Sequence, residues 1–267
     1  MSIQVCIAGV TGWTGSAVTR SIIDSDDFSL SGAAARAAAG RDVGDALGLP
    51  RKTGVTICDS VAEALKAGAD VLIDYTTAAS VKGHVLHAID NGVAVVVGTS
   101  GMSAADYDDI AAHADARGIG VIGGGNYSLT ATLMQHLALI AAEHVPEFEV
   151  LDFAWAEKED VPSGTARELA EKLGDVRQPD KGRAIDSLHG PKETRGAAIN
   201  GVQVHSVRMS GFTLRCEAVF GMAGERLAVS HEAGQSAEPY VSGTLLAAKR
   251  VVDVTGLVRG LGDLLFK

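Results

Sequence analysis

Val5-Cys-Ile-Ala-Gly9-Val-Thr-Gly12-Trp-Thr-Gly15, near the start of the chain, decides the fold. The apolar residues before Gly9 predict a short strand, and the glycines predict a tight turn into a helix that begins near Gly12. The spacing is Gly-x-x-Gly-x-x-Gly, but it still lets backbone approach a pyrophosphate beside free helix N–H groups. We expect a dinucleotide site here, formed by Gly9, Thr11, Gly12, Trp13, Thr14 and Gly15; the alternative is a helix start that binds nothing.

The first 125 residues repeat this strand-then-helix pattern. Short β-branched runs predict strands at Val5–Ala8, Ala69–Tyr75, Val93–Gly98 and Ile119–Gly123. Alanine-rich segments between them predict helices at Ala17–Ser25, Val61–Ala67, Ser80–Asn91 and Ala104–Arg117. Strands that are apolar on both faces and alternate with helices are typical of a parallel sheet. The predicted fold class is therefore α/β, with an N-terminal Rossmann-like doubly wound parallel sheet.

The pattern changes near residue 148. Longer strands are predicted at Phe148–Trp155, Gly201–Met209, Thr213–Gly221 and Glu225–Ala233. The last three follow one another without a helix, which indicates a C-terminal α+β domain with an open mixed sheet. The stretch Gly174–Asn200 is predicted to be a long loop, and a helix at Tyr240–Val252 is expected to pack back on the first domain. We therefore assign residues 1–127 and 237–267 to a dinucleotide-binding domain, and residues 128–236 to a substrate-binding and oligomerisation domain.

Composition excludes several classes of function. The formal charge of −10 argues against nucleic acid or an anionic membrane as a partner. No apolar run approaches the roughly 20 residues of a spanning helix, and we see no signal peptide. Cys6, Cys58 and Cys216 are far apart and show no metal-ligand pairing, so no metal is expected. A cytoplasmic protein fits these observations.

The segment after the expected second strand bears on the choice between NADPH and NADH. An acidic residue there would bond the ribose 2′-hydroxyl of NADH, whereas an arginine would pair with the 2′-phosphate of NADPH. The segment contains Arg36 and Arg41 and has no acid before Asp42. We predict NADPH as the preferred cofactor, with NADH second, held by Arg36 and with Arg41 as a further candidate. The alternative is two solvated surface arginines.

Three later loops follow the carboxyl ends of expected strands, where ligands bind in such sheets. Their candidate cofactor-binding residues are Tyr75, Thr76, Gly98, Thr99, Ser100, Asn126 and Tyr127. The small and hydroxyl residues among them allow a nicotinamide to lie close to the backbone. The Asn126 amide either meets the nicotinamide carboxamide or caps the helix that follows.

The stretch Lys158-Glu-Asp-Val-Pro-Ser-Gly-Thr-Ala166 predicts the substrate site. Free N–H groups at a helix start attract anions, so Ser163, Gly164 and Thr165 are candidates to bind a substrate carboxylate. The ammonium of Lys158 adds positive charge and a transferable proton. Two other interpretations stay open: Lys158 as an exposed lysine in a charged turn, and Ser163 as a helix cap without further function.

Together these motifs resemble the 4-hydroxy-tetrahydrodipicolinate reductase (dihydrodipicolinate reductase) family, pyridine-nucleotide reductases of lysine and diaminopimelate biosynthesis. The resemblance covers the whole chain and is most specific in the Lys-x-Asp-x-Pro-Ser-Gly-Thr-Ala run. It implies Lys158 as the catalytic residue, a carboxylate held by Gly164 and Thr165, and a small carboxylate substrate. It also implies a homotetramer formed through the open sheets.

The chain departs from the family pattern at several positions. Ala154 and Trp155 stand where the family has paired histidines, and Asp152 stands in place of a glutamate. Cys216 and Ala237 take the places of a later histidine and an arginine. Trp155 is therefore included among the substrate-binding residues. Three possibilities follow: Lys158 carries the proton alone, the substrate is another imino or keto acid, or the chain is a non-catalytic nucleotide-binding homologue.

Overall fold

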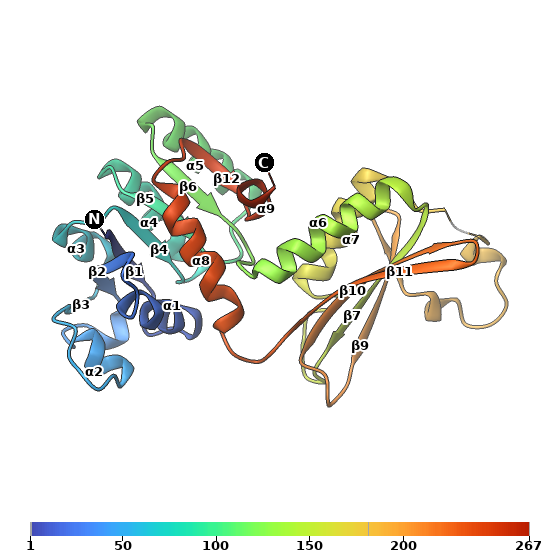
Figure 1. Cartoon of the computed structure of the whole chain (residues 1–267), viewed down its shortest axis with the longest axis horizontal. Coiled ribbons are helices and arrows are strands. Elements are labelled where there is room, and N and C mark those ends of the chain that lie inside the picture. Colours follow the sequence, from blue (N-terminus) through green and yellow to red (C-terminus); the bar gives the residue numbers. More distant parts are fainter. Residues whose placement is uncertain (1, 181, 267) are drawn as a thin grey trace. The chain divides into compact units, whose positions relative to one another are not determined.

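The chain forms two compact units in a computed structural model that describes residues 2–180 and 182–266 (Figure 1). The first unit runs to Leu129 and resumes at Ala237, and the second is Thr130–Ser236. The C-terminal segment therefore belongs to the same unit as the glycine-rich start of the chain.

Seven parallel strands form the sheet of the first unit, in the order β12-β6-β5-β4-β1-β2-β3. The strands are β1 (Ile3–Ala8), β2 (Phe28–Ala34), β3 (Ile57–Cys58), β4 (Val71–Asp74), β5 (Ala94–Val97), β6 (Gly120–Gly123) and β12 (Gly256–Arg259). The helices are α1 (Trp13–Ile23), α2 (Val43–Leu47), α3 (Val61–Ala64), α4 (Ala78–Asp90), α5 (Ala104–Arg117), α8 (Glu238–Val251) and α9 (Gly262–Leu265). The strand order switches direction between β1 and β4, where open α/β sheets bind their ligands. The predicted doubly wound parallel sheet is confirmed.

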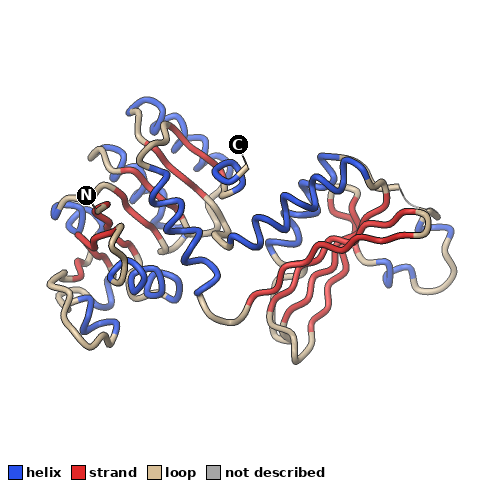
Figure 2. The backbone as a smooth tube through the Cα atoms, in the orientation of Figure 1, coloured by secondary structure: helices blue, strands red, loops and turns tan. Residues whose placement is uncertain are grey.

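Helices cover both faces of this sheet (Figure 2). On one face α1 and α8 bury Val18, Ile22 and Val251 against the strands. On the other face α4 and α5 bury Val85 and Ile110. The strands are apolar on both faces because both faces are covered. The expectation that the C-terminal helix packs on the first domain is also confirmed, since α8 packs in the same core as α1.

Five strands form the mixed sheet of the second unit, in the order β11-β10-β7-β9-β8. They are β7 (Glu147–Ala154), β8 (Ala197–Ile199), β9 (Val202–Arg208), β10 (Leu214–Met222) and β11 (Glu225–Ala233). Only the β7–β9 pair is parallel among the pairings of this sheet's described residues. Helices α6 (Leu129–His144) and α7 (Gly164–Val176) pack on one face of the sheet. The predicted open mixed sheet is confirmed.

The stretch predicted as a long loop, Gly174–Asn200, holds more structure than expected. It contains the end of α7, two 3₁₀ turns at Ile185–Ser187 and Lys192–Arg195, and strand β8. Strand β8 forms because Asn200 and Gly201 have φ values of 45° and 81°, the left-handed conformation of a two-residue hairpin turn. The Asn-Gly pair was the signal for this hairpin.

Within residues 2–180 and 182–266, no helix combines the length and apolar character needed to cross a membrane. The same residues contain no cluster of three or more His, Cys, Asp or Glu side chains suited to a metal ion.

Candidate active site

The β1–α1 turn brings backbone close to backbone at the switch point of the parallel sheet. Gly9 has a φ of 84°, and a Cβ there would overlap the carbonyl oxygen of Tyr75. A Cβ at Gly15 would overlap the carbonyl oxygen of Gly9. Gly12 precedes α1 without any side-chain cap, so the N–H groups of the first helical turn are left for a ligand. This arrangement fits a dinucleotide pyrophosphate.

The exposed part of this turn consists of side chains that the sequence placed in the cofactor site. Trp13 is 60% exposed, and its ring lies edge-on to Tyr240 with the centroids 5.8 Å apart. Thr11 is exposed, and Thr14 is half-buried. All three lie within one turn of the uncapped start of α1.

A buried carboxylate, Asp74, ties together the loops after β4 and β5. It is fully buried, and its Oδ1 accepts from the hydroxyls of Thr76 (2.6 Å) and Thr99 (2.7 Å) and from the Thr76 N–H. Its Oδ2 lies 2.7 Å from Nδ1 of His84 on α4. Thr76 and Thr99, both predicted cofactor residues, are thus brought together, and their hydroxyls are held by Asp74.

The two tyrosines among the predicted cofactor residues pack their side chains into the core. The ring of Tyr75 packs against Gly98, and its hydroxyl lies 2.6 Å from that of Thr244 on α8. Burial raises the pKa of Tyr75. Tyr127 is buried, and its hydroxyl lies 3.0 Å from the carbonyl oxygen of Val97. A nucleotide would therefore meet the backbone of these loops and the exposed Ser100.

Asn126 follows β6, and its side-chain oxygen accepts from the Ser128 N–H at 2.9 Å just before α6. This contact is a local side-chain-to-backbone turn that precedes the helix.

The segment after β2 places Arg36 at the surface. Arg36 is exposed and begins a 3₁₀ turn two residues past the strand. Arg41 donates to the carbonyl oxygen of Asp45 at 3.0 Å. The carboxylate of Asp42 accepts backbone N–H bonds from Thr53 and from Gly44, which lower its pKa. Asp42 is thus committed to its own turn and offers no carboxylate to a ribose.

Lys158 lies in the turn that joins β7 to α7 in the second unit. Its ammonium pairs with the Asp160 carboxylate and lies 5.2 Å from the centroid of the Trp155 ring. The Lys158 side chain is only 16% exposed, so it is not the freely solvated lysine of the alternative interpretation. Burial acts to raise the pKa of Asp160, but the Lys158 ammonium and the Arg208 guanidinium hold it below its usual value.

Helix α7 begins directly after this turn. The Ser163 hydroxyl accepts from the Ala166 N–H at 3.3 Å, which confirms the helix-cap interpretation of Ser163. Gly164 is exposed and Thr165 is half-buried in the first turn. Of the predicted substrate-binding residues, Trp155 thus lies beside the Lys158 ammonium, and Ser163, Gly164 and Thr165 form the start of α7.

Two residues at these sites were missed from the sequence. His84 pairs with Asp74, and Arg208, on β9, donates to the carboxylate of Asp152 at 2.7 Å. An arginine at the end of a strand that alternates apolar and polar residues was a weak signal for Arg208. His84 gave no signal, because ten residues separate it from the aspartate that it contacts.

The whole chain matches two family models. Residues 3–127 match "Dihydrodipicolinate reductase, N-terminus", and residues 129–265 match "Dihydrodipicolinate reductase, C-terminus". This chain belongs to the dihydrodipicolinate reductase family.

Named relatives agree with the match. A 4-hydroxy-tetrahydrodipicolinate reductase from Moorella thermoacetica is 35% identical over 99% of this chain and 98% of its own length. Another from Desulfitobacterium hafniense is 33% identical over 98% of both chains. Among solved structures, a dipicolinate-bound dihydrodipicolinate reductase from Paenisporosarcina sp. TG-14 has a TM-score of 0.88 and 26% identity, covering 99% of this chain and all of that one. An amine dehydrogenase from Mycobacterium smegmatis, at 17% identity and a TM-score of 0.69, shares the fold.

Two positions that the sequence singled out, Ala154 and Cys216, lie behind the lysine turn of this reductase-family chain. Ala154 is fully buried, and Cys216 is buried beside Asp152 in the β7–β10 register. Burial raises the pKa of the Cys216 thiol to about 12, so this thiol stays protonated at neutral pH and is a poor acid. Neither residue supplies a proton donor to the site.

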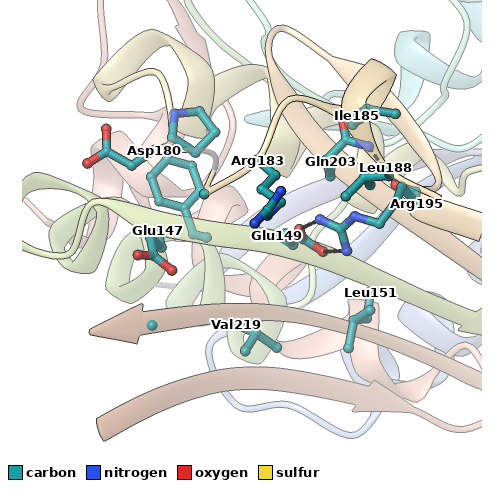
Figure 3. A pocket seen from close by; sticks show the side chains of 14 residues that line it. Glu147, Glu149, Leu151, Asp180, Arg183, Ile185, Leu188, Arg195, Gln203 and Val219 are labelled. Carbon is teal, nitrogen blue, oxygen red and sulfur yellow. Dashed lines mark hydrogen bonds and ion pairs between the residues drawn. The ribbon is translucent and has the colours of Figure 1, made fainter. Parts of the chain in front are cut away.

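The mixed sheet carries a pocket of about 510 Å³ on the face away from α6 and α7 (Figure 3). Glu149 on β7 pairs there with Arg195 and lies 2.7 Å from Nε2 of His205. Leu151 and Val219 add apolar surface. The imidazole of His205 is therefore held by a carboxylate beside this pocket.

Proposed function

We propose that this chain reduces 4-hydroxy-tetrahydrodipicolinate with NADPH and that Lys158 supplies the proton. The observation that carries the proposal is the short turn in which Lys158 lies over Trp155, directly before the helix start at Gly164. Family membership already makes the chain a nicotinamide-dependent reductase of lysine and diaminopimelate biosynthesis. When bound, the nicotinamide supplies a hydride.

The turn and the start of α7 would bind the substrate carboxylate and donate the proton. The N–H groups at Gly164 and Thr165 point out of the first turn of α7 and would bind a substrate carboxylate. Hydride addition to one end of a conjugated double bond leaves negative charge that a proton must neutralise. The Lys158 ammonium is the donor present beside that carboxylate site. Asp160 holds the ammonium in place until a substrate engages it.

Trp155 bears on the identity of the substrate. Its ring offers a flat apolar face and one N–H donor in a position where the resemblance implies a histidine. A planar ring can stack on that face, which supports the cyclic substrate. Loss of the second donor at Ala154 favours an alternative in which the substrate is a different imino or keto acid. A non-catalytic role is the remaining alternative, and tight NADPH binding without any turnover would support it.

NADPH is proposed as the preferred cofactor for two reasons. Arg36 is exposed two residues after β2, and the Asp42 carboxylate already accepts backbone N–H bonds from Gly44 and Thr53. If Arg36 pairs with the 2′-phosphate, Arg36→Ala should raise the Michaelis constant for NADPH and leave that for NADH unchanged. An unchanged NADPH constant would show that Arg36 is a solvated surface arginine.

A homotetramer in the cytoplasm is also proposed, with the open face of the mixed sheet as its interface. That face carries Leu151, Val219 and the Glu149 ion pairs, opposite the side on which α6 and α7 pack. Sedimentation equilibrium should give four times the 27.4 kDa chain mass. A monomer would refute this proposal without bearing on the reaction.

The decisive experiment follows NADPH and NADH absorbance with freshly generated 4-hydroxy-tetrahydrodipicolinate. Lys158→Ala should lower kcat about 10²–10⁴-fold, the usual loss for a positioned general acid. Lys172→Ala is the matched control, because Lys172 pairs with Glu168 on the surface of α7. If NADPH binds and no oxidation occurs, the substrate proposal is wrong, and other imino and keto acids become the candidates.

A substitution at Trp155, where the chain differs from the family pattern, distinguishes the two candidate substrates. Trp155→His restores a donor at a half-buried site and should raise kcat for 4-hydroxy-tetrahydrodipicolinate if this is the native substrate. Ala154 is unsuited to the same change, because it is fully buried and a larger side chain would overpack the core. Lower activity of Trp155→His on this substrate and on other ring imines would show that the indole itself is required.

A further inference from the structure

A buried ion pair fastens the Lys158 turn at both ends. The Asp152 carboxylate lies on β7 just before the turn and is 1% exposed. Its Oδ2 accepts from the Ser163 N–H (2.9 Å), which is the residue where the turn enters α7. It also accepts from the Ser206 hydroxyl (3.1 Å) and from the Arg208 guanidinium (2.7 Å). One carboxylate thus joins the two ends of the turn.

Arg208 reaches the turn from the neighbouring strand. Its side chain is 12% exposed, and it is the register partner of Ala154 at the end of β9. One nitrogen donates to the Asp152 carboxylate and to the carbonyl oxygen of Asp160 (2.8 Å). The other donates to the carbonyl oxygen of Asp152 at 3.2 Å. The guanidinium therefore bonds the start of the turn and also the residue that pairs with Lys158.

The outer residues of the turn add little packing of their own. Glu157, Glu159, Asp160 and Val161 are all exposed, so they bury little apolar surface. The Lys158 ammonium contacts Asp160 and the Trp155 ring, which belong to the same turn. The position of the lysine relative to the helix start at Gly164 is consequently fixed through Asp152 and Arg208.

We propose that Asp152 and Arg208 are positioning residues that set the placement of Lys158 for proton transfer. The inference rests on the proposed role of Lys158. Arginine suits this task because its planar fork serves several acceptors at once and keeps its charge. A lysine at 208 would supply the charge without the fork, and a misplacement of the proton donor by about 1 Å costs about 10²-fold in rate.

A double-mutant cycle distinguishes positioning from plain stabilisation. Arg208→Lys should lower kcat by about 10²-fold while the Kd for NADPH stays unchanged. In the Lys158→Ala background the same substitution should have no further effect on kcat, because its effect acts through the lysine. Equal losses in both backgrounds would overturn the proposal. Asp152→Glu, which keeps the carboxylate, should retain more kcat than Asp152→Asn.

Ser206→Ala is the matched control. It removes one hydrogen-bond donor from Oδ2 of Asp152. Unlike Arg208, the described Ser206 side chain has no bond to a residue of the turn itself. We expect its kcat to stay within about twofold of the unsubstituted chain, since the Arg208 guanidinium and the Ser163 N–H still hold the Asp152 carboxylate and the turn. A loss equal to that of Arg208→Lys would mean that any contact to Asp152 matters equally, which contradicts a specific role for Arg208.

A readout without turnover keeps this inference separate from the proposed reaction. In a Trp13→Phe background, Trp155 is the remaining tryptophan and reports on the turn. Arg208→Lys should increase acrylamide quenching of Trp155, and Ser206→Ala should not. Unchanged quenching in Arg208→Lys would overturn the positioning role even if the chain proved inactive on every imino acid.

Discussion

In each unit, one buried carboxylate near the end of a strand holds the loop that carries the candidate site. Asp74 ends β4 in the parallel sheet, and Asp152 lies two residues from the end of β7 in the mixed sheet. Both are buried, and each accepts a backbone N–H from the loop that follows it. A loop with few apolar contacts thereby acquires a fixed geometry.

The two carboxylates differ in how their charge is balanced. Asp74 is surrounded by hydroxyls, an N–H and the titratable ring of His84. Asp152 is paired with the permanently charged guanidinium of Arg208. The nucleotide end is held mainly by hydroxyl and backbone N–H donors, whereas the lysine turn is held by an arginine–carboxylate pair. Substitutions should therefore affect the two units to different degrees.

The largest effect is expected for Asp152→Asn. The change leaves the Arg208 guanidinium buried without its carboxylate, which typically costs about 3–5 kcal/mol. Urea unfolding followed by Trp155 fluorescence in a Trp13→Phe background measures the second unit. A loss below about 1 kcal/mol, the range of an exposed ion pair, would show that solvent reaches this pair.

Gly9→Ala tests the backbone approach at the nucleotide end. A left-handed conformation costs a non-glycine residue about 1–2 kcal/mol, and overlap with the Tyr75 carbonyl oxygen adds about 1–3 kcal/mol. We expect lower stability of the first unit and weaker NADPH binding, measured by unfolding and fluorescence titration. Gly40→Ala is the matched control, because Gly40 has a φ of 83° with nothing near a Cβ. Equal losses in both variants would show that the approach to Tyr75 does not matter.

Asp74→Asn should cost less than Asp152→Asn. It removes charge from a network of mainly neutral donors, and an unsatisfied buried partner costs about 1–3 kcal/mol. Trp13 fluorescence in a Trp155→Phe background reports the unfolding of the first unit. The comparison between the units fails if Asp74→Asn is as destabilising as Asp152→Asn.

The smallest effect concerns a half-buried surface carboxylate, Asp106 at the start of α5. The Lys82 ammonium and then the Ser103 hydroxyl and N–H lower its pKa from 3.8 to about 2. Because the folded pKa is depressed, its contribution to stability is present above pH 3.8 and is lost as the pH falls toward 2. The free energies of unfolding of the unsubstituted chain and of Asp106→Asn, measured from pH 5 to 2, should become equal at the acid end. Asp108→Asn, on the same helix, controls for the loss of one charge, and a difference that persists at pH 2 would contradict the prediction.

The chain's local patterns determined most of its architecture. The parallel sheet is predicted by the glycine-rich turn at Gly9–Gly15, which joins a strand to a helix, and by the alternation of strands and helices that follows. Three successive strands without a helix predict the mixed one. These features follow from hydrophobic periodicity and from glycine's freedom at the turn, which are properties of residues near one another in sequence. The Lys158–Ala166 stretch was identified as a lysine beside a helix start, and its role as a substrate site was implied by the resemblance to the reductase family.

Only the tertiary structure decided which side chains hold these stretches in place. Asp74 meets Thr99 across 25 residues, and Asp152 meets Arg208 across 56. Tyr75 and Tyr127 turned out to bury their rings in the core beside the loops that the sequence assigned to the cofactor. Such pairings depend on strand order and register, which bring together residues far apart in the chain. A sequence pattern records the period of each element but not its neighbour in the sheet, so the partners of the buried carboxylates could not be predicted from it.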